Sequence, residues 1–418
     1  MIAEVISVGD ELLIGQVVNT NQAYIAEQLN SVGVAVGRMT TVGDNEEMTL
    51  KSFGESFARC DVIVVTGGLG PTHDDITRAA VCKFFQTDLV VNDEALKRIR
   101  EIFQKRGLAP RKINEDQALV PRSCAVIQNF HGTAPGYLFE QPGKYFIVMP
   151  GVPFEMKAMM QDFVLPFFAK RASGMVIQHR TLKTTGIGES FLAEQIGNVD
   201  DLFPPNSSVT LGFLPSPTGT RLRITARATS IAEAKANIQG VEEKIRGRAG
   251  KYVYGVDDEE MEQIIGRLLT ERKLAIAVAE SCTGGLIADR ITNVPGSSNY
   301  FERGVITYSN ESKAAELSVP LAFIQKYGAV SREVAEAMAF GVRKKANTDI
   351  GLSATGIAGP TGGTPEKPVG LVWIGYSDRS ETLALRFNFR DDRRRVKERA
   401  AQAALELVRR RLLRIEVP

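Results

Sequence analysis

The chain has 418 residues, of which 44% are hydrophobic and 24% charged, and its formal net charge is +2 at pH 7. This length exceeds one ordinary hydrophobic core, so we expect two or three domains of a globular protein. A charge this small argues against electrostatic capture of nucleic acid as the main task, because proteins with that task are distinctly basic.

The first 170 residues alternate strand-like and helix-like segments. One of the strand-like segments, 61–66, is an almost continuous apolar run, which is typical of a parallel sheet. Repeated βα units predict a doubly wound α/β domain over 1–170, with its ligand at the carboxyl ends of the strands. The predicted strands are 3–8, 34–41, 61–66 and 144–149, and the predicted helices are 21–31, 50–59 and 154–170.

The pattern changes at residue 171 and changes back at residue 256. Residues 171–255 predict a small α+β domain, and residues 256–418 resume the βα rhythm. The predicted fold class is therefore two three-layer parallel-sheet α/β domains joined by a small α+β domain. The predicted strands are 180–185, 221–229, the apolar run before Ser281, 304–308, 350–354 and 370–376. The predicted helices are 231–246, one that ends at residue 271, one that ends at residue 291, one around Lys313, 331–345 and 393–413.

The cysteines and the start of the chain bear on location. The four cysteines have neither zinc-ligand nor disulfide spacing, and the first residues lack a basic region before an apolar run. No apolar run approaches the roughly 20 residues that span a bilayer. We therefore expect a reduced, cytoplasmic protein with no membrane partner.

Two acidic pairs and a glycine-rich turn follow predicted strands of the N-terminal domain. A glycine-rich turn that leads into a helix suits phosphate, and carboxylates at adjacent strand ends suit a divalent metal ion that would bridge phosphate oxygens. For a single aspartate, a role at a helix N-terminus is the more common alternative, and His73 is expected to be incidental. The predicted metal ligands are Asp10, Glu11, Asp74 and Asp75, and the predicted phosphate-binding residues are Thr66, Gly67, Gly68, Gly70 and Thr72.

A second glycine-rich turn follows the strand that ends before Ser281. It holds two possible nucleophiles, Ser281 and Cys282, and the residues alone do not decide between them. All three histidines lie upstream of this domain, which leaves Lys313 as the natural base of a Ser–Lys pair. Asn310 is expected to cap a helix that has Lys313 in its first turn, where the dipole disfavours a cation. Tyr308, at a predicted strand end, could orient the nucleophile or relay a proton.

Four segments of the C-terminal domain resemble the nicotinamide-nucleotide amidase domain of the CinA (competence/damage-inducible) family. They are Ala279-Glu280-Ser281-Cys282-Thr283-Gly284-Gly285, Phe301-Glu302-Arg303-Gly304, Tyr308-Ser309-Asn310-Glu311-Ser312-Lys313 and Ala354-Thr355-Gly356-Ile357-Ala358-Gly359-Pro360. The resemblance implies hydrolysis of nicotinamide mononucleotide to nicotinate mononucleotide and ammonia, without a cofactor. It implies Ser281 as the nucleophile with Lys313 and Tyr308 assisting, and Thr283 and Gly284 as the oxyanion hole.

The same resemblance implies residues that hold the substrate. Thr355, Gly356 and the loop after them would bind it. The family's Gly-Asp-Arg before the last helix stands here as Asp391-Asp392-Arg393, so Arg393 is kept as a candidate active-site cation although an aspartate replaces the glycine.

The acidic pairs and the glycine-rich turn of the N-terminal domain resemble the molybdopterin-binding-like domain of the same family. Two further motifs carry this resemblance, Asn129…Gly132…Ala134-Pro135-Gly136 and Met149-Pro150-Gly151-Val152-Pro153. That resemblance implies metal-dependent cleavage of ADP-ribose. The middle domain is similar to the family's KH-like linker, but Gly186-Ile187-Gly188-Glu189 is too short and too acidic for an RNA-binding loop. We therefore expect two enzymes of pyridine-nucleotide salvage on one chain, with a homodimer as the expected assembly. The alternatives are that only one domain is active, or that the chain is a pterin- or nucleotide-binding regulator.

Overall fold

The computed structural model describes residues 1–72, 74–105, 107–171 and 175–417. The chain falls into two compact units, which are described separately. The domain boundaries predicted at 170/171 and 255/256 stay predictions. The units are Met1–Gln178 with Ala226–Ala236, and His179–Thr225 with Asn237–Pro418.

Six strands form the sheet of the first unit, in the order β2-β1-β3-β8-β7-β6. The first four are mutually parallel, as predicted, whereas β7 and β6 continue the sheet antiparallel. The sheet is therefore mixed, and its antiparallel edge was not predicted. The strands are β1 (Ile2–Val8), β2 (Ala35–Val42), β3 (Val62–Thr66), β6 (Ala125–Ile127), β7 (Gly136–Gln141) and β8 (Lys144–Met149).

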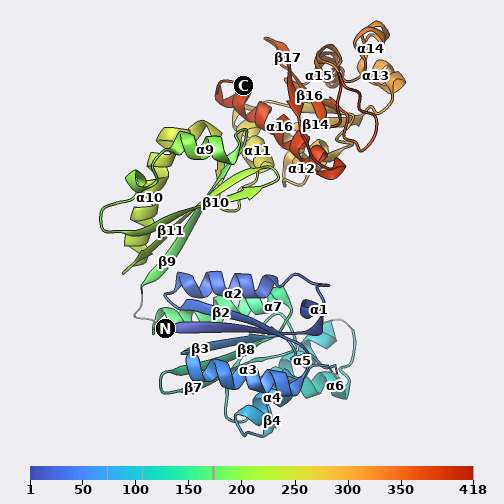
Figure 1. The fold of residues 1–418 in the computed structure, drawn as a ribbon. Coiled ribbons are helices and arrows are strands. Elements are labelled where there is room, and N and C mark those ends of the chain that lie inside the picture. Colours follow the sequence, from blue (N-terminus) through green and yellow to red (C-terminus); the bar gives the residue numbers. More distant parts are fainter. Residues whose placement is uncertain (73, 106, 172–174, 418) are drawn as a thin grey trace. The chain divides into compact units, whose positions relative to one another are not determined.

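Helices cover both faces of this sheet, which makes three layers (Figure 1). Helices α2 (Thr20–Ser31) and α7 (Pro153–Met159) bury one apolar cluster, and α3 (Glu46–Arg59) and α4 (Thr77–Phe84) bury the other. The predicted helix 154–170 is interrupted by a π-helical turn after α7. The remaining elements are α1 (Asp10–Leu13), α5 (Asp93–Lys105), α6 (Lys112–Glu115), α8 (Leu165–Ala169) and a two-stranded sheet of β4 (Leu89–Val91) and β5 (Leu119–Pro121).

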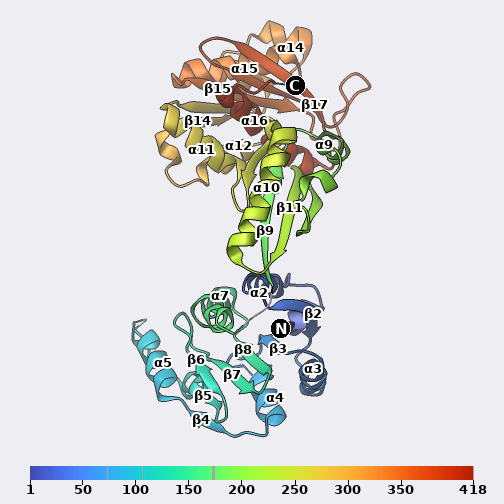
Figure 2. The ribbon, with the colours of Figure 1, turned by 90° about the vertical axis from the view of Figure 1, so that its left-hand side faces the viewer.

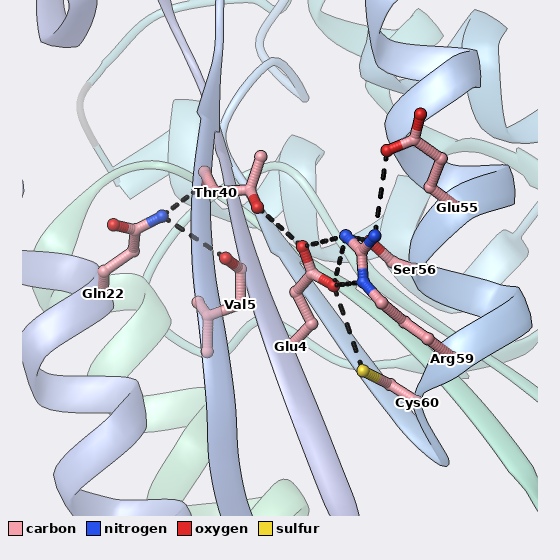
Figure 3. Close-up of polar contacts among 8 residues, drawn as sticks. All are labelled: Glu4, Val5, Gln22, Thr40, Glu55, Ser56, Arg59 and Cys60. Carbon is pink, nitrogen blue, oxygen red and sulfur yellow. Dashed lines mark hydrogen bonds and ion pairs between the residues drawn. The ribbon is translucent and has the colours of Figure 1, made fainter.

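A buried carboxylate connects strands β1 and β2 with helix α3 (Figure 3). Glu4 of β1 is completely buried and accepts hydrogen bonds from Arg59 Nε and Nη2, both 2.8 Å, and from Thr40 Oγ1 at 2.6 Å. On the other side of the strands, Gln22 Nε2 donates to the carbonyl oxygens of Val5 and Thr40. These contacts tie α2 and α3 to β1 and β2, so their role is structural.

The small α+β domain has a four-stranded sheet in the order β10-β11-β9-β12. Strand β12 pairs antiparallel with β9. Figure 2 shows the long helix α10 running along this sheet. The elements are β9 (Val176–Thr184), α9 (Glu189–Ile196), β10 (Ser208–Ser216), β11 (Gly219–Ala228), α10 (Ile231–Ala249) and β12 (Val253–Val256).

The C-terminal sheet has the order β14-β13-β15-β16-β17. Its first three strands are parallel, and β16 and β17 are antiparallel additions. The strands are β13 (Ile276–Glu280), β14 (Phe301–Ile306), β15 (Ile350–Gly356), β16 (Leu371–Ser377) and β17 (Thr382–Asn388).

Helices also cover both faces of the C-terminal sheet. Helices α11 (Met261–Arg272), α12 (Leu286–Thr292) and α16 (Arg393–Leu413) enclose the larger apolar cluster. On the opposite face the second cluster lies under α13 (Asn310–Leu317), α14 (Leu321–Tyr327) and α15 (Arg332–Ala346). The predicted α/β fold class, with a small α+β domain between two layered domains, is confirmed.

Candidate active sites

Ser281 stands where the central parallel strand of the C-terminal sheet ends. Its backbone N–H donates to the carbonyl of Ala354 on the neighbouring strand β15, at 2.9 Å. The chain then leaves the sheet through Gly284 and Gly285, which have φ values of 62° and 97° and so suit glycine. This turn leads into α12 and leaves Ser281 at the carboxyl edge of the sheet, as predicted.

Lys313 lies against Ser281. Its Nζ atom is 3.1 Å from Ser281 Oγ and 2.8 Å from the carbonyl oxygen of Thr307, and the side chain is 1% exposed. Burial lowers the pKa of the Lys313 ammonium, and the negative charge of Glu311 acts against this shift. The sequence thus brings together a hydroxyl and a lysine that is easier to deprotonate than an ordinary one.

The cap of α13 differs from the prediction. Ser309, not Asn310, is the N-cap, and its Oγ accepts the backbone N–H of Ser312 at 3.0 Å. Strand β14 also ends at Ile306 rather than at residue 308. Serine binds a helix N-terminus as well as asparagine does, so the residue types alone did not fix the position. Lys313 still falls in the first turn.

Glu280 fixes the turn that carries Ser281, a role that sequence reasoning missed. Its carboxylate accepts three backbone N–H groups at the start of α12, from Gly285 at 2.9 Å, Ile287 at 3.1 Å and Ala288 at 2.9 Å. The N-terminus of a helix favours an anion, and the side chain is 1% exposed. The N–H of Gly284 itself has no hydrogen-bond acceptor in the part of the chain that the structure describes.

Cys282 faces the apolar core rather than the site. Its side chain belongs to the cluster under α12 and α16, and it is 5% exposed. Burial raises the pKa of its thiol to about 12. A protonated, inaccessible thiol is a poor nucleophile, and this environment favours Ser281 over Cys282.

Tyr308 and Arg393 contact each other at the edge of the site. Arg393 Nη2 donates to the Tyr308 hydroxyl at 3.0 Å, and Nη1 donates to the carbonyl oxygen of Gly359 at 2.7 Å. Tyr308 is 62% exposed, and among the described residues no hydrogen bond joins its hydroxyl to Ser281 or Lys313. The structure therefore brings the Tyr308 side chain to Arg393, whereas the Tyr308 carbonyl oxygen accepts from Lys313 Nζ at 3.3 Å.

The remaining predicted residues lie at or just after the carboxyl ends of β13 and β15. Thr283 is completely buried, and its Oγ1 has no hydrogen-bond partner among the described residues. Thr355 Oγ1 donates to the carbonyl oxygen of Ala329 at 2.8 Å, so this hydroxyl is already engaged. Gly356 ends β15, where a Cβ atom would come within 2.7 Å of the Leu371 carbonyl oxygen. The strand can therefore accept only glycine there without shifting.

A cavity of about 480 Å³ opens at the carboxyl edge of the N-terminal sheet. Most of the predicted phosphate-binding and acidic residues line this cavity, but Asp10 and Thr72 do not. Predicted residues that do line it are Glu11, Thr66, Gly67, Gly68, Gly70, Asp74 and Asp75. His73 lies outside the described residues.

Asp75 holds the glycine-rich loop in shape. Its carboxylate accepts the backbone N–H groups of Gly70 and Thr72, each at 2.8 Å, and also the Thr72 hydroxyl. Both oxygens are therefore used within the loop. Thr66 Oγ1 donates to the Pro150 carbonyl oxygen at 2.8 Å, so this hydroxyl is also engaged. These contacts agree better with a structural role for Asp75 than with metal binding.

Of the other carboxylates, Glu11 and Asp74 line the cavity together with Asp44, which was not predicted. Asp44 and Asp10 exchange hydrogen bonds between side chain and backbone, at 3.0 and 3.1 Å. Burial, and the nearby negative charges of Asp10, Glu11 and Asp74, raise the pKa of Asp44. Asp44 follows strand β2, so searching every strand end for acids would have found it.

The described acidic residues of this cavity do not form a cluster of three metal ligands. Within the described ranges, no three histidine, cysteine or acidic side chains come close enough to hold one ion. The divalent metal predicted from the sequence stays a prediction.

The fold and the two strand-end sites define a multidomain α/β protein with a buried Ser–Lys pair. Three family descriptions match it in succession: "Probable molybdopterin binding domain" over residues 4–170, "Damage-inducible protein CinA KH domain" over 179–255, and "CinA C-terminal domain" over 258–412. The chain belongs to the CinA family.

Full-length relatives support this membership. A "CinA-like protein" of Dictyoglomus thermophilum is 45% identical over 99% of this chain and 100% of its own length. Another "CinA-like protein", from Kosmotoga olearia, is 43% identical over 99% of both chains. Among solved structures, the competence/damage inducible protein CihA of Agrobacterium tumefaciens is 37% identical, covers 37% of this chain and 93% of its own, and has a TM-score of 0.36. Among the described residues, no helix has the length and apolar character needed to span a membrane.

Proposed function

We propose that the C-terminal domain hydrolyses the carboxamide of nicotinamide mononucleotide, giving nicotinate mononucleotide and ammonia. The observation that carries the proposal is the 3.1 Å contact between Ser281 Oγ and the Nζ of the buried Lys313. The specific substrate follows from the resemblance of the motifs around Ser281, Lys313 and Thr355 to the amidase domain of the family.

The first half of the reaction uses Lys313 as a base. A neutral amine has two N–H bonds and one lone pair. The carbonyl oxygens of Thr307 and Tyr308, 2.8 and 3.3 Å from Nζ, can accept the two N–H bonds. The lone pair is then free to take the proton of Ser281 Oγ as this oxygen attacks the carboxamide carbon.

The second half returns the proton and releases the acyl group. Lys313 donates its proton to the leaving nitrogen, the C–N bond breaks, and ammonia departs. Lys313 then deprotonates a water molecule that attacks the ester on Ser281, which frees the carboxylate and restores the hydroxyl. The N–H of Gly284 can stabilise the negative oxygen of each tetrahedral intermediate, because no acceptor occupies it among the described residues.

Ammonia release tests this proposal. The purified chain is incubated with nicotinamide mononucleotide in the presence of EDTA, and ammonia and nicotinate mononucleotide are quantified together. We expect equal amounts of both products and no effect of the chelator. A folded protein that releases neither product would refute the proposal.

A second activity in the N-terminal domain is supported by the cavity lined by Gly67, Gly68 and Gly70. Backbone N–H groups of a glycine-rich loop suit a phosphate or pyrophosphate group. We propose that this cavity binds ADP-ribose and that its cleavage requires an added divalent metal ion. Formation of AMP and ribose 5-phosphate with Mg²⁺ or Mn²⁺, but not with EDTA, would support the activity; no AMP under either condition would refute it.

A further inference from the structure

Lys397 places an unpaired cation over the turn that follows Ser281. Its Nζ atom lies 3.4 Å from the position that a Cβ atom would occupy at Gly284. The side chain is partly buried, and no hydrogen bond or ion pair of Lys397 is found within the described ranges. This ammonium is therefore held beside the candidate active site without an anion.

The acidic side chains nearest to Lys397 in the sequence form ion pairs with other residues. Helix α16 packs against α12, and the turn that contains Gly284 directly precedes α12. Every carboxylate between residues 391 and 398 contacts an arginine and not Lys397: Asp391 contacts Arg395 and Arg399, Asp392 contacts Arg395, and Glu398 contacts Arg394.

Arg393 adds a second cation to the same face. It precedes Lys397 by four residues, a spacing that places two side chains on one side of a helix. Its guanidinium bonds only neutral groups among the described residues, the Tyr308 hydroxyl and the Gly359 carbonyl oxygen. Two positive charges thus border the Ser281 turn, and within the described ranges neither forms an ion pair; the Glu280 carboxylate of this turn is bonded to backbone N–H groups instead.

We propose that Lys397, together with Arg393, binds the phosphate of the carboxamide substrate and so selects a phosphorylated nucleoside over the uncharged one. This inference rests on the proposed amidase function and names the group that the site recognises. An ammonium and a guanidinium are the side chains that bind phosphate through charge-assisted hydrogen bonds. Lys397 would act on binding, because its amine lies over the turn and not beside Ser281 Oγ.

The test compares two substrates that differ only in the phosphate, nicotinamide mononucleotide and nicotinamide riboside. For Lys397→Gln we expect KM for the mononucleotide to rise about tenfold to a hundredfold, as expected for loss of one charge-assisted contact, with kcat nearly unchanged. Turnover of the riboside should change less than about twofold, since that substrate has no phosphate to lose. Lys397→Arg should restore most of the affinity.

Arg394→Gln is the matched control. It removes one positive charge from the same turn of α16, but Arg394 is exposed and pairs with Glu398. We expect no change in KM for either substrate. An equal loss for both substrates in Lys397→Gln, or no loss for the mononucleotide, would overturn the proposal.

A binding measurement separates this inference from the proposed reaction. Calorimetry of the mononucleotide and the riboside is carried out on Ser281→Ala and on Ser281→Ala with Lys397→Gln. Weaker binding of the mononucleotide alone in the double variant supports the phosphate subsite even if the native chain releases no ammonia. Binding that does not depend on Lys397 overturns the subsite even if the native chain is an active amidase.

Discussion

The substitution Glu280→Gln tests whether one carboxylate holds the nucleophile turn together. Glutamine has the same shape but only one oxygen. If that oxygen keeps the bonds from Gly285 and Ile287, the amide nitrogen faces the N–H of Ala288, so two buried donors oppose each other. An unsatisfied buried donor costs about 1–3 kcal/mol, and the lost interaction of the charge with the helix N-terminus costs about 0.3–1 kcal/mol more.

We therefore expect the free energy of unfolding of the C-terminal domain to fall by about 3 kcal/mol. The single tryptophan, Trp373, lies in β16 beside Thr355 of β15, so its fluorescence during urea unfolding reports on this sheet. The matched control is Asp289→Asn, which removes an exposed acid from the first turn of the same helix and should cost about 1 kcal/mol or less. If Glu280→Gln is no more destabilising than this control, the three hydrogen bonds do not support the turn as argued.

Two further predictions concern titration. Because burial lowers the pKa of Lys313 and the neutral amine is the base, kcat/KM for nicotinamide mononucleotide should rise with pH. It should reach half its maximum below the ordinary lysine pKa of about 10.4. A midpoint of the pH–rate profile at or above this pKa would contradict the role of burial. Burial acts to raise the pKa of Glu4, but hydrogen bonds from Thr40 and Arg59 lower this pKa overall. The ionised Glu4 carboxylate therefore stabilises the folded chain above the unfolded pKa of about 4.3, and this stabilisation is lost as the pH falls through the folded pKa. Glu4→Gln should cost about 2 kcal/mol at pH 7, since solvent screens the partly exposed Arg59, and should make urea stability less dependent on acid; an unchanged acid dependence would argue against this cluster.

Local patterns in the sequence predicted the long elements well. The strand 144–149 and the helix 393–413 have the predicted bounds, because an uninterrupted apolar run and a long amphipathic pattern leave few alternatives. Strand β17 was missed, since none of its residues is fully buried at the sheet edge and its pattern gives a weak signal. The antiparallel additions to both sheets follow from tertiary pairing, which single-sequence periodicity does not contain.

The candidate site was predictable where the chain itself brings residues to a strand end. Ser281 and Lys313 follow neighbouring parallel strands, so the topology alone places them together. Lys397 was not predicted, because it lies 113 residues after Gly284 in a helix whose packing is a long-range property. Glu280 precedes Ser281 directly, yet nothing in its local pattern shows that its side chain turns back to the start of α12.

Comparison of three proteins tests the central claim most directly. Ammonia release from nicotinamide mononucleotide is measured for the native chain, Ser281→Ala and Cys282→Ala, each with EDTA present and each checked for folding by Trp373 fluorescence. The account predicts activity in the native chain and in Cys282→Ala and its loss in Ser281→Ala. Activity that survives in Ser281→Ala, or that is lost only in Cys282→Ala, would contradict the assignment of the serine as nucleophile.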